Sequence, residues 1–89
     1  MKIKDGFVMR RVGAQAMVVA TGEASLQFHS MVKLNATGAD IWTWIEKGCD
    51  EAAIVQALVD KYDVDEARAT AALERFLSQM RAEGLVSDD

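Results

Sequence analysis

The side chains that most often carry out nucleophilic or metal chemistry are scarce in this 89-residue chain, which has one histidine, His29, and one cysteine, Cys49. A zinc site needs three or four His, Cys or carboxylate ligands at recurring spacings, and no such set accompanies His29. Cys49 has no neighbouring histidine that would generate a reactive thiolate. We therefore expect a solvent-facing His29 on a strand, an ordinary, partly buried thiol at Cys49, and no bound metal or cofactor.

The carboxylates do not form a recognisable acid–base pair. General acid–base catalysis needs carboxyl groups that converge on one pocket, whereas these fall at predicted helix caps and on polar helix faces, as in Glu51, Asp60, Glu66 and Glu74. The glycines stand singly at predicted element ends and form no phosphate-binding loop: Gly13, Gly22, Gly38, Gly48 and Gly84. Binding is the chemistry that remains, so we expect a protein that is not an enzyme.

Composition narrows the class of partner. The net charge of −4 opposes general attraction to nucleic-acid phosphates, which clustered Lys and Arg drive. No apolar run reaches the roughly 20 residues that span a bilayer, and the N-terminus has no apolar signal-peptide core. The lone cysteine agrees with a reducing compartment. We therefore expect one domain over residues 1–89, located in the cytoplasm, with no nucleic-acid or membrane partner.

Three antiparallel strands are predicted in the first part of the chain. The β-rich segment 7–12 is followed by a turn at 13–15 and a second strand over 16–20, which predicts a hairpin. Apolar residues then alternate with polar ones along 26–34, as expected for a strand with one buried face. A bend at His29 and Ser30 would leave only residues 30–34 paired in the sheet.

Three amphipathic helices follow, over about 36–46, from the Asp50 cap to Tyr62, and over 66–83. Asp65 is expected to cap the third helix, and either Asn35 or Thr37 the first. Thr37 with Asp40 also fits a capping box. The last residues, 87–89, are expected to fray.

Trp42 and Trp44 point about 200 degrees apart on the first helix, so one ring is expected in the core and the other at least partly exposed. Apolar helix stripes beside a sheet with one apolar face imply an α+β fold, in which the helices pack on one side of a small antiparallel sheet. The tight turn between the second and third helices also gives the outline of a winged helix-turn-helix. This outline does not by itself identify a function.

One family resembles the chain over most of its length. The segment Met31-Val32-Lys33-Leu34-Asn35-Ala36-Thr37-Gly38-Ala39-Asp40-Ile41-Trp42 is followed by Asp50, Ile54-Val55 and Leu58, then by Tyr62-Asp63-Val64-Asp65, Phe76-Leu77 and Gly84-Leu85-Val86. In order and spacing this resembles the PqqD family of pyrroloquinoline quinone biosynthesis and the related recognition domains of ribosomally synthesised, modified peptides. The chain departs from many relatives at Ala72, where they carry an acidic residue, and at 21–25, where their segment contains proline.

The resemblance implies a peptide chaperone that binds a precursor or leader peptide and delivers it to a modifying enzyme, often a radical SAM protein. The peptide would add as a strand beside the third strand, opposite the third helix. Small side chains at Ala69 and Ala72 would leave room for it, and Arg68 and Arg75 would meet its acidic residues. By resemblance, the binding residues are Ser30, Met31, Val32, Lys33, Arg68, Ala69, Ala72, Leu73, Arg75, Phe76 and Met80, of which Leu73 and Phe76 are equally well explained as core.

A winged-helix DNA-binding or regulatory module is the alternative function. The third helix mixes arginines with glutamates, namely Arg68, Arg75 and Arg81 with Glu66, Glu74 and Glu83. A recognition helix is normally more one-sidedly basic, so the peptide-binding interpretation is preferred. The sequence leaves open whether the protein is a homodimer paired through its strand edge.

Overall fold

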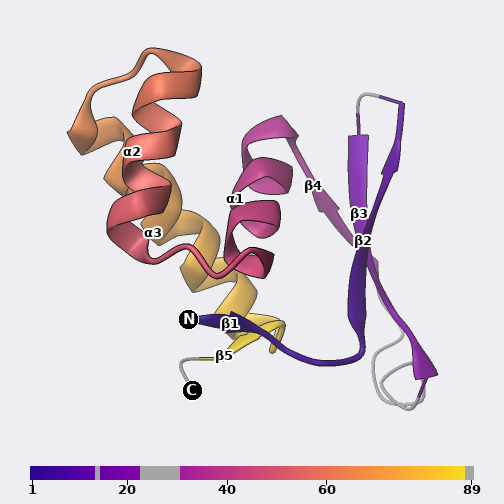
Figure 1. The fold of residues 1–89 in the computed structure, drawn as a ribbon. Helices are drawn as coiled ribbons and strands as arrows, with labels where there is room; N and C mark the ends of the chain where they lie inside the picture. The colour runs from indigo at the N-terminus through magenta and orange to yellow at the C-terminus, as the bar shows by residue number, and fades with distance from the viewer. Residues whose placement is uncertain (14, 23–30, 88–89) are drawn as a thin grey trace.

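The computed structural model describes residues 1–13, 15–22 and 31–87 and has an α+β architecture, as the sequence predicted (Figure 1). Four strands precede three helices, and a short strand ends the described part. The elements are β1 (Lys2–Ile3), β2 (Phe7–Val12), β3 (Gln15–Ala20), β4 (Val32–Leu34), α1 (Ala36–Glu46), α2 (Glu51–Tyr62), α3 (Glu66–Ala82) and β5 (Val86–Ser87).

The main sheet is antiparallel, with the strand order β2-β3-β4. The hairpin between β2 and β3 pairs Val12 with Gln15, and Gly13 supplies the positive φ of 62° that such a tight turn requires. In β4 the predicted alternation holds, because Val32 and Leu34 are buried and Lys33 is exposed. The strand is shorter than predicted, since Met31 lies outside it, and the predicted positions 26–30, His29 included, fall outside the described residues.

A second, two-stranded sheet joins the two ends of the chain. Lys2 pairs with Ser87 and Ile3 with Val86, and the Lys4 amide donates to the Leu85 carbonyl at 2.9 Å. The prediction that Ser87 frays was wrong, because β1 supplies the hydrogen-bond partners that a terminal segment otherwise lacks. Two strands of this length carry too little periodic signal to be recognised in the sequence.

The helices begin at the predicted caps. Asn35 accepts a hydrogen bond from the Gly38 amide at 2.8 Å, and Asp50 and Asp65 cap α2 and α3 in the same way. The capping box of Thr37 and Asp40 was wrong, because Asn35 occupies the cap and the Asp40 carboxylate points to another site. At the end of α2, Asp63 takes the left-handed conformation with φ of 53°, which Asp tolerates better than most residues.

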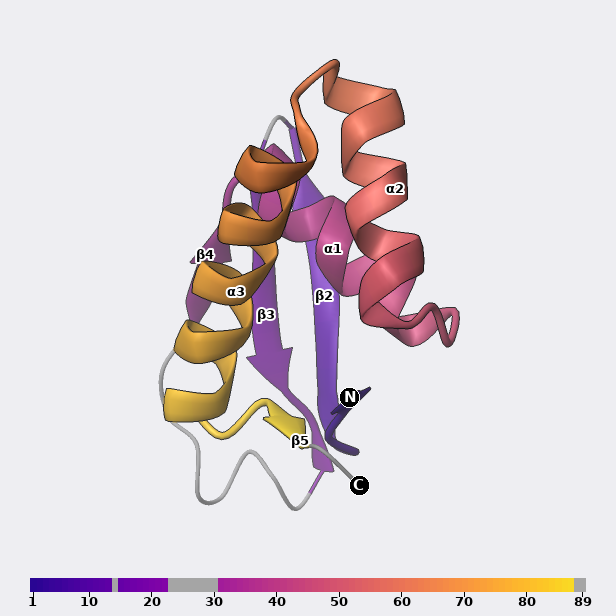
Figure 2. The ribbon, with the colours of Figure 1, turned by 90° about the vertical axis from the view of Figure 1, so that its left-hand side faces the viewer.

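All three helices lie on one side of the main sheet (Figures 1 and 2). Trp42 is fully buried between them and the sheet, whereas Trp44 is half-buried, as the helical spacing predicted. Within the described residues, the indole Nε1 of Trp42 is the buried side-chain polar atom without a hydrogen-bond partner. No helix in the described part of the chain is long and apolar enough to cross a bilayer.

Candidate functional site

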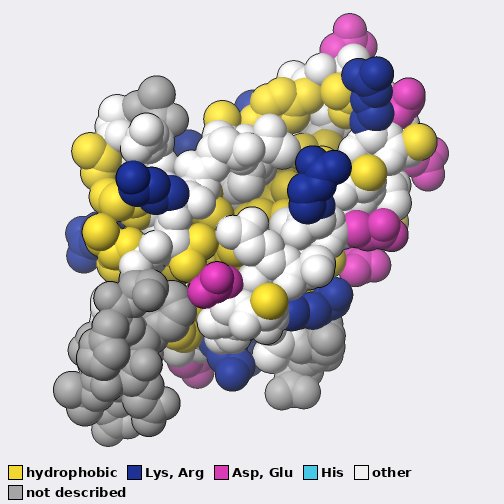
Figure 3. Space-filling view, turned by 180° about the vertical axis from the view of Figure 1, so that it is seen from behind, with side chains coloured by type: hydrophobic (Ala, Val, Ile, Leu, Met, Phe, Trp, Pro, Cys, Tyr) yellow, Lys and Arg dark blue, Asp and Glu magenta, His cyan; other side chains and the backbone are white. Residues whose placement is uncertain are grey.

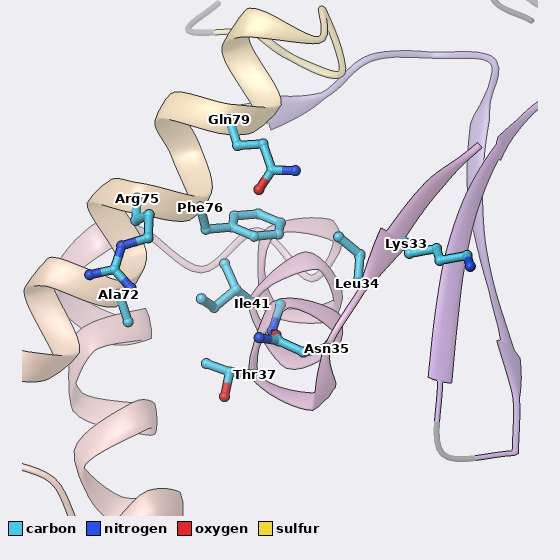
Figure 4. A pocket seen from close by; sticks show the side chains of 10 residues that line it. Lys33, Leu34, Asn35, Thr37, Ile41, Ala72, Arg75, Phe76 and Gln79 are labelled. Carbon is cyan, nitrogen blue, oxygen red and sulfur yellow. The ribbon is translucent and has the colours of Figure 1, made fainter. Parts of the chain in front are cut away.

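A pocket of about 170 Å³ opens where β4 runs into α1 and α3 passes alongside (Figure 4). Its walls come from three elements that are far apart in the sequence. We call this pocket and its rim the groove. The lining residues are Lys33, Leu34, Asn35, Thr37, Gly38, Ile41, Ala72, Arg75, Phe76 and Gln79.

The floor of the groove is apolar. Leu34 and Ile41 are buried, and the ring of Phe76 projects from α3 toward Leu34 (Figure 4). Gly38 belongs to this floor because a Cβ on it would lie 3.5 Å from Phe76 Cε2, in van der Waals contact with the ring. An apolar cavity of about 150 Å³ accommodates benzene. The groove therefore has room for one aromatic or branched aliphatic side chain.

The groove lies beside a free strand edge. Since β4 is the outer strand of the main sheet, its second edge pairs with no strand among the described residues. Such an edge presents backbone N–H and C=O groups that an added strand can bind. The floor and the edge together suit an extended peptide that hydrogen-bonds through its main chain and inserts a side chain.

The rim of the groove is polar and includes one charged side chain from α3. Arg75 and Gln79 are exposed on α3, and Asn35 and Thr37 lie opposite on α1. Lys33 contributes to the lining, but its side chain points away over the sheet (Figure 4). Since no described residue forms an ion pair with Arg75, its guanidinium remains available to a carboxylate.

The structure brings some of the predicted binding residues to the groove and keeps others away. Lys33, Ala72, Arg75 and Phe76 line it. Met31 is 61% exposed just before β4, and Arg68 is exposed in the first turn of α3, outside the lining. The other predicted residues with described positions are buried core side chains that do not line the pocket: Val32, Ala69, Leu73 and Met80. Ser30 lies outside the described residues.

Sequence reasoning missed six lining residues. Gln79 carried a usable signal, because it lies one heptad after Ala72 and therefore on the same face of α3. The other five come from the strand-to-helix junction and the first turns of α1, where the sequence pattern did not show which side chains meet α3. They are Leu34, Asn35, Thr37, Gly38 and Ile41.

Beside the groove, the buried carboxylate of Asp40 joins α1, α2 and the β2–β3 hairpin. It is 8% exposed and accepts a hydrogen bond from the Tyr62 hydroxyl. Lys61 Nζ lies 2.8 Å from its Oδ2, and an Arg11 guanidinium nitrogen lies 3.6 Å from its Oδ1. A buried carboxylate is costly unless it is paired in this way, so the cluster fixes the hairpin relative to the helices.

The same contacts shift the ionisation of the cluster. Burial raises the pKa of Asp40, but hydrogen bonds from Lys61 and Tyr62 and the charges of Lys61 and Arg11 outweigh it and hold the pKa below that of an ordinary aspartate. Burial and donation to Asp40 raise the pKa of Tyr62, against a smaller opposing effect of a Thr37 hydrogen bond. The hydrogen bond to Asp40 raises the pKa of Lys61. At neutral pH the Asp40 carboxylate is therefore charged and paired with Lys61 and Arg11, and the Tyr62 hydroxyl is neutral.

The described residues hold no group of three or more His, Cys, Asp or Glu side chains that could bind a metal ion. Cys49 is half-buried, as predicted, and the carboxylates Glu51, Asp60, Glu66 and Glu74 are all exposed. The apolar floor of the groove, the neighbouring edge of β4 and the exposed Arg75 make the groove the candidate site.

Comparisons with known proteins agree with the fold. In the structure "TbiB1 in Complex with the TbiA(beta) Leader Peptide", the protein chain is similar to this one, with a TM-score of 0.85 and 27% identity. The alignment covers 100% of this chain and 98% of that one. No curated protein matches the chain. The family model described as Coenzyme PQQ synthesis protein D (PqqD) matches residues 17–86, and the chain therefore belongs to the PqqD family.

Proposed function

We propose that this protein is a non-catalytic peptide chaperone that binds a precursor or leader peptide in the groove. The peptide adds as a strand to the free edge of β4 and inserts an apolar side chain over Leu34, Ile41 and Phe76. The observation that carries the proposal is a pocket of about 170 Å³ with an apolar floor, beside an edge of β4 that pairs with no strand among the described residues. Main-chain hydrogen bonds then supply affinity, and the pocket supplies sequence selectivity.

The structural neighbour supports this choice. TbiB1 was solved with a leader peptide, and this chain has a similar backbone over its whole length. Residues on both walls of the groove contact the peptide in this proposal. Lys33 contributes main-chain groups, Ala72 and Phe76 contact the inserted side chain, and Arg75 meets a peptide carboxylate. Met31, which is 61% exposed at the entrance to β4, adds apolar contact.

The bound peptide is presented to a peptide-modifying enzyme, of the radical SAM type by analogy with the family. The product is either a quinone cofactor precursor or another modified peptide. A short precursor peptide and a modifying enzyme encoded beside this gene would identify both partners, and this peptide is the ligand for the experiments below.

Two neighbouring alanines on α3 provide the test. Ala72 lines the groove, whereas Ala71 is exposed outside it, so Ala72→Leu adds an isopropyl group to the pocket and Ala71→Leu adds the same group elsewhere. Burying one apolar side chain contributes about 1.5–3 kcal/mol. Titration of the peptide by calorimetry should therefore show at least about tenfold weaker binding to Ala72→Leu and wild-type affinity for Ala71→Leu.

Backbone NMR shifts locate the site independently. Peptide addition should move the amide signals of residues 31–38 and of the α3 face from Ala72 to Gln79. Equal loss of affinity in both leucine variants, or shifts confined to other surfaces, would contradict binding in the groove.

A further inference from the structure

The face of the main sheet that points away from the helices is an apolar surface with a basic fringe. Paired residues of an antiparallel sheet point to the same side. Val32 and Leu34 lie on the buried side, so the alternate positions form the opposite one. We call it the outer sheet face, and its residues are Val8, Arg10, Val12, Gln15, Met17, Val19 and Lys33.

The central row of this face runs across all three strands. Arg10 pairs with Met17, and Met17 pairs with Lys33, so one methionine lies between two cations. Val8 pairs with Val19 on one side of this row, and Val12, which is 60% exposed, lies on the other. None of the described helices covers the face, because α1, α2 and α3 all pack on the opposite side of the sheet (Figures 1 and 2).

Two cations, Arg10 and Lys33, belong to this face. Arg10 and Lys33 are exposed, and neither forms an ion pair with any part of the chain that the structure describes. The protein as a whole carries a net charge of −4. Helices α1, α2 and α3 carry Asp40, Glu46, Glu51, Asp60, Glu66 and Glu74, and Figure 3 shows acidic side chains gathered on one part of the surface. The outer sheet face is therefore complementary to a surface with an apolar centre and carboxylates at its edge.

We propose that the outer sheet face is the docking surface for the peptide-modifying enzyme, through an apolar, acidic-rimmed patch on that enzyme. The inference rests on the proposed function. A peptide added to β4 becomes the fourth strand of the same sheet, so every second peptide side chain points to the outer sheet face next to Lys33. An enzyme on this face contacts the chaperone and the peptide together, and the peptide lies beside the enzyme that acts on it.

The small area of the outer sheet face implies that docking of the enzyme depends on the bound peptide. The paired residues of the three strands cover roughly 250 Å² at the usual strand spacing and rise. A stable protein–protein interface buries about 800 Å² per partner. The sheet face alone is too small for a stable interface. An added strand enlarges it by roughly 100 Å² and brings the rest of the peptide within reach of the enzyme. We expect the peptide to raise the affinity for the enzyme about tenfold, and the enzyme to raise peptide affinity by the same factor, as linkage requires.

The test uses the full chain, its leader peptide and the purified modifying enzyme encoded beside this gene. Arg10→Glu and Val12→Glu alter the outer sheet face two strands away from β4. Lys47→Glu at the end of α1 and Ala67→Glu on α3 make the same kinds of change at exposed positions away from it. Val12→Thr keeps the β-branched shape and controls for folding. Enzyme binding to the immobilised protein is measured with and without saturating peptide, and peptide binding is measured separately without enzyme.

The expected result is at least tenfold weaker enzyme binding for Arg10→Glu and Val12→Glu, with unchanged peptide affinity, and wild-type binding of both partners by the controls Lys47→Glu and Ala67→Glu. Wild-type enzyme binding by both sheet variants overturns the inference, as does an enzyme affinity that is independent of peptide. Loss of self-association in the sheet variants would assign the face to a second copy instead. Failure of the peptide to bind the wild-type protein alone would refute the proposed function, which distinguishes the two failures.

Discussion

Gly38 in the first turn of α1 lies against the ring of Phe76 on α3, so that a Cβ at this position would be 3.5 Å from Phe76 Cε2. It would also be 3.2 Å from Oδ1 of Asn35, the oxygen that caps α1. The absence of a side chain at Gly38 thus keeps the groove open and leaves room for the helix cap.

Gly38→Ala should weaken peptide binding with little effect on stability. Alanine stabilises a helix by about 1 kcal/mol relative to glycine. Displacing the Asn35 cap costs up to about 1 kcal/mol, so the net change in the free energy of unfolding should stay within about 1 kcal/mol. The added methyl group narrows the pocket and should lower peptide affinity about three- to tenfold, measured by calorimetry beside thermal unfolding. Unchanged affinity in a folded variant would remove Gly38 from the site.

Asp40→Asn should destabilise the protein, because the substitution removes the charge from a buried carboxylate bonded to Tyr62 and Lys61. Hydrogen bonds to charged groups contribute about 1.5–3 kcal/mol, which predicts a loss of this order in the free energy of unfolding. Asp60→Asn is the matched control, since Asp60 is exposed and bonds only to the Gln56 side chain among described groups. Urea unfolding of both variants measures the difference, and equal losses would contradict a structural role for Asp40.

The Asp40 contribution should depend on pH in a defined window. Folding lowers the pKa of Asp40, so the unfolded chain takes up a proton at this residue more readily than the folded chain. The stabilisation by Asp40 is therefore present above about pH 4 and is lost as the pH falls through the pKa of the folded state. The raised pKa values of Tyr62 and Lys61 give the opposite sign, with stability lost as the pH rises above about 10. Thermal midpoints of wild type and Asp40→Asn from pH 2 to pH 9 should converge at the acid end, and a constant gap would refute the assignment.

Arg75→Gln should lower the affinity for a peptide that carries a carboxylate near the groove. Exposed ion pairs contribute about 0.2–1 kcal/mol, which corresponds to a loss of roughly 1.5- to fivefold and a weaker salt dependence. Arg68→Gln makes the same change on α3 outside the groove and should have no effect. A peptide with the acidic residue replaced by its amide should bind the wild type and Arg75→Gln equally, and equal effects of the two arginine substitutions would count against this contact.

Periodicity predicted most of the fold because it reports on local geometry. The hairpin, the three helices and the caps at Asp50 and Asp65 all follow from signals within a few residues of each other. The errors arose where the partner is distant in sequence. Ser87 pairs with Lys2 in the two-stranded sheet. The Asp40 carboxylate accepts a hydrogen bond from Tyr62 and does not take part in a capping box with Thr37. No local sequence pattern reveals either partner.

The candidate site was predictable in outline only. The resemblance directed attention to β4 and α3, and Ala72, Arg75 and Phe76 do line the groove. Helical spacing alone did not separate Ala72 from Ala69, or Arg75 from Arg68, because the members of each pair lie near the same face of α3. Which member reaches the groove depends on how α3 lies against α1 and β4.

The sequence by itself determined the element types, the α+β class, the acidic net charge and the family, since these depend on residue identity and on spacing within short segments. The tertiary structure decided which side chains form the groove, which carboxylate is buried and which face of the sheet the three helices cover. Those outcomes depend on how the helices pack on the sheet. Packing is set by contacts between residues such as Gly38 and Phe76, which are far apart in the chain and share no local pattern.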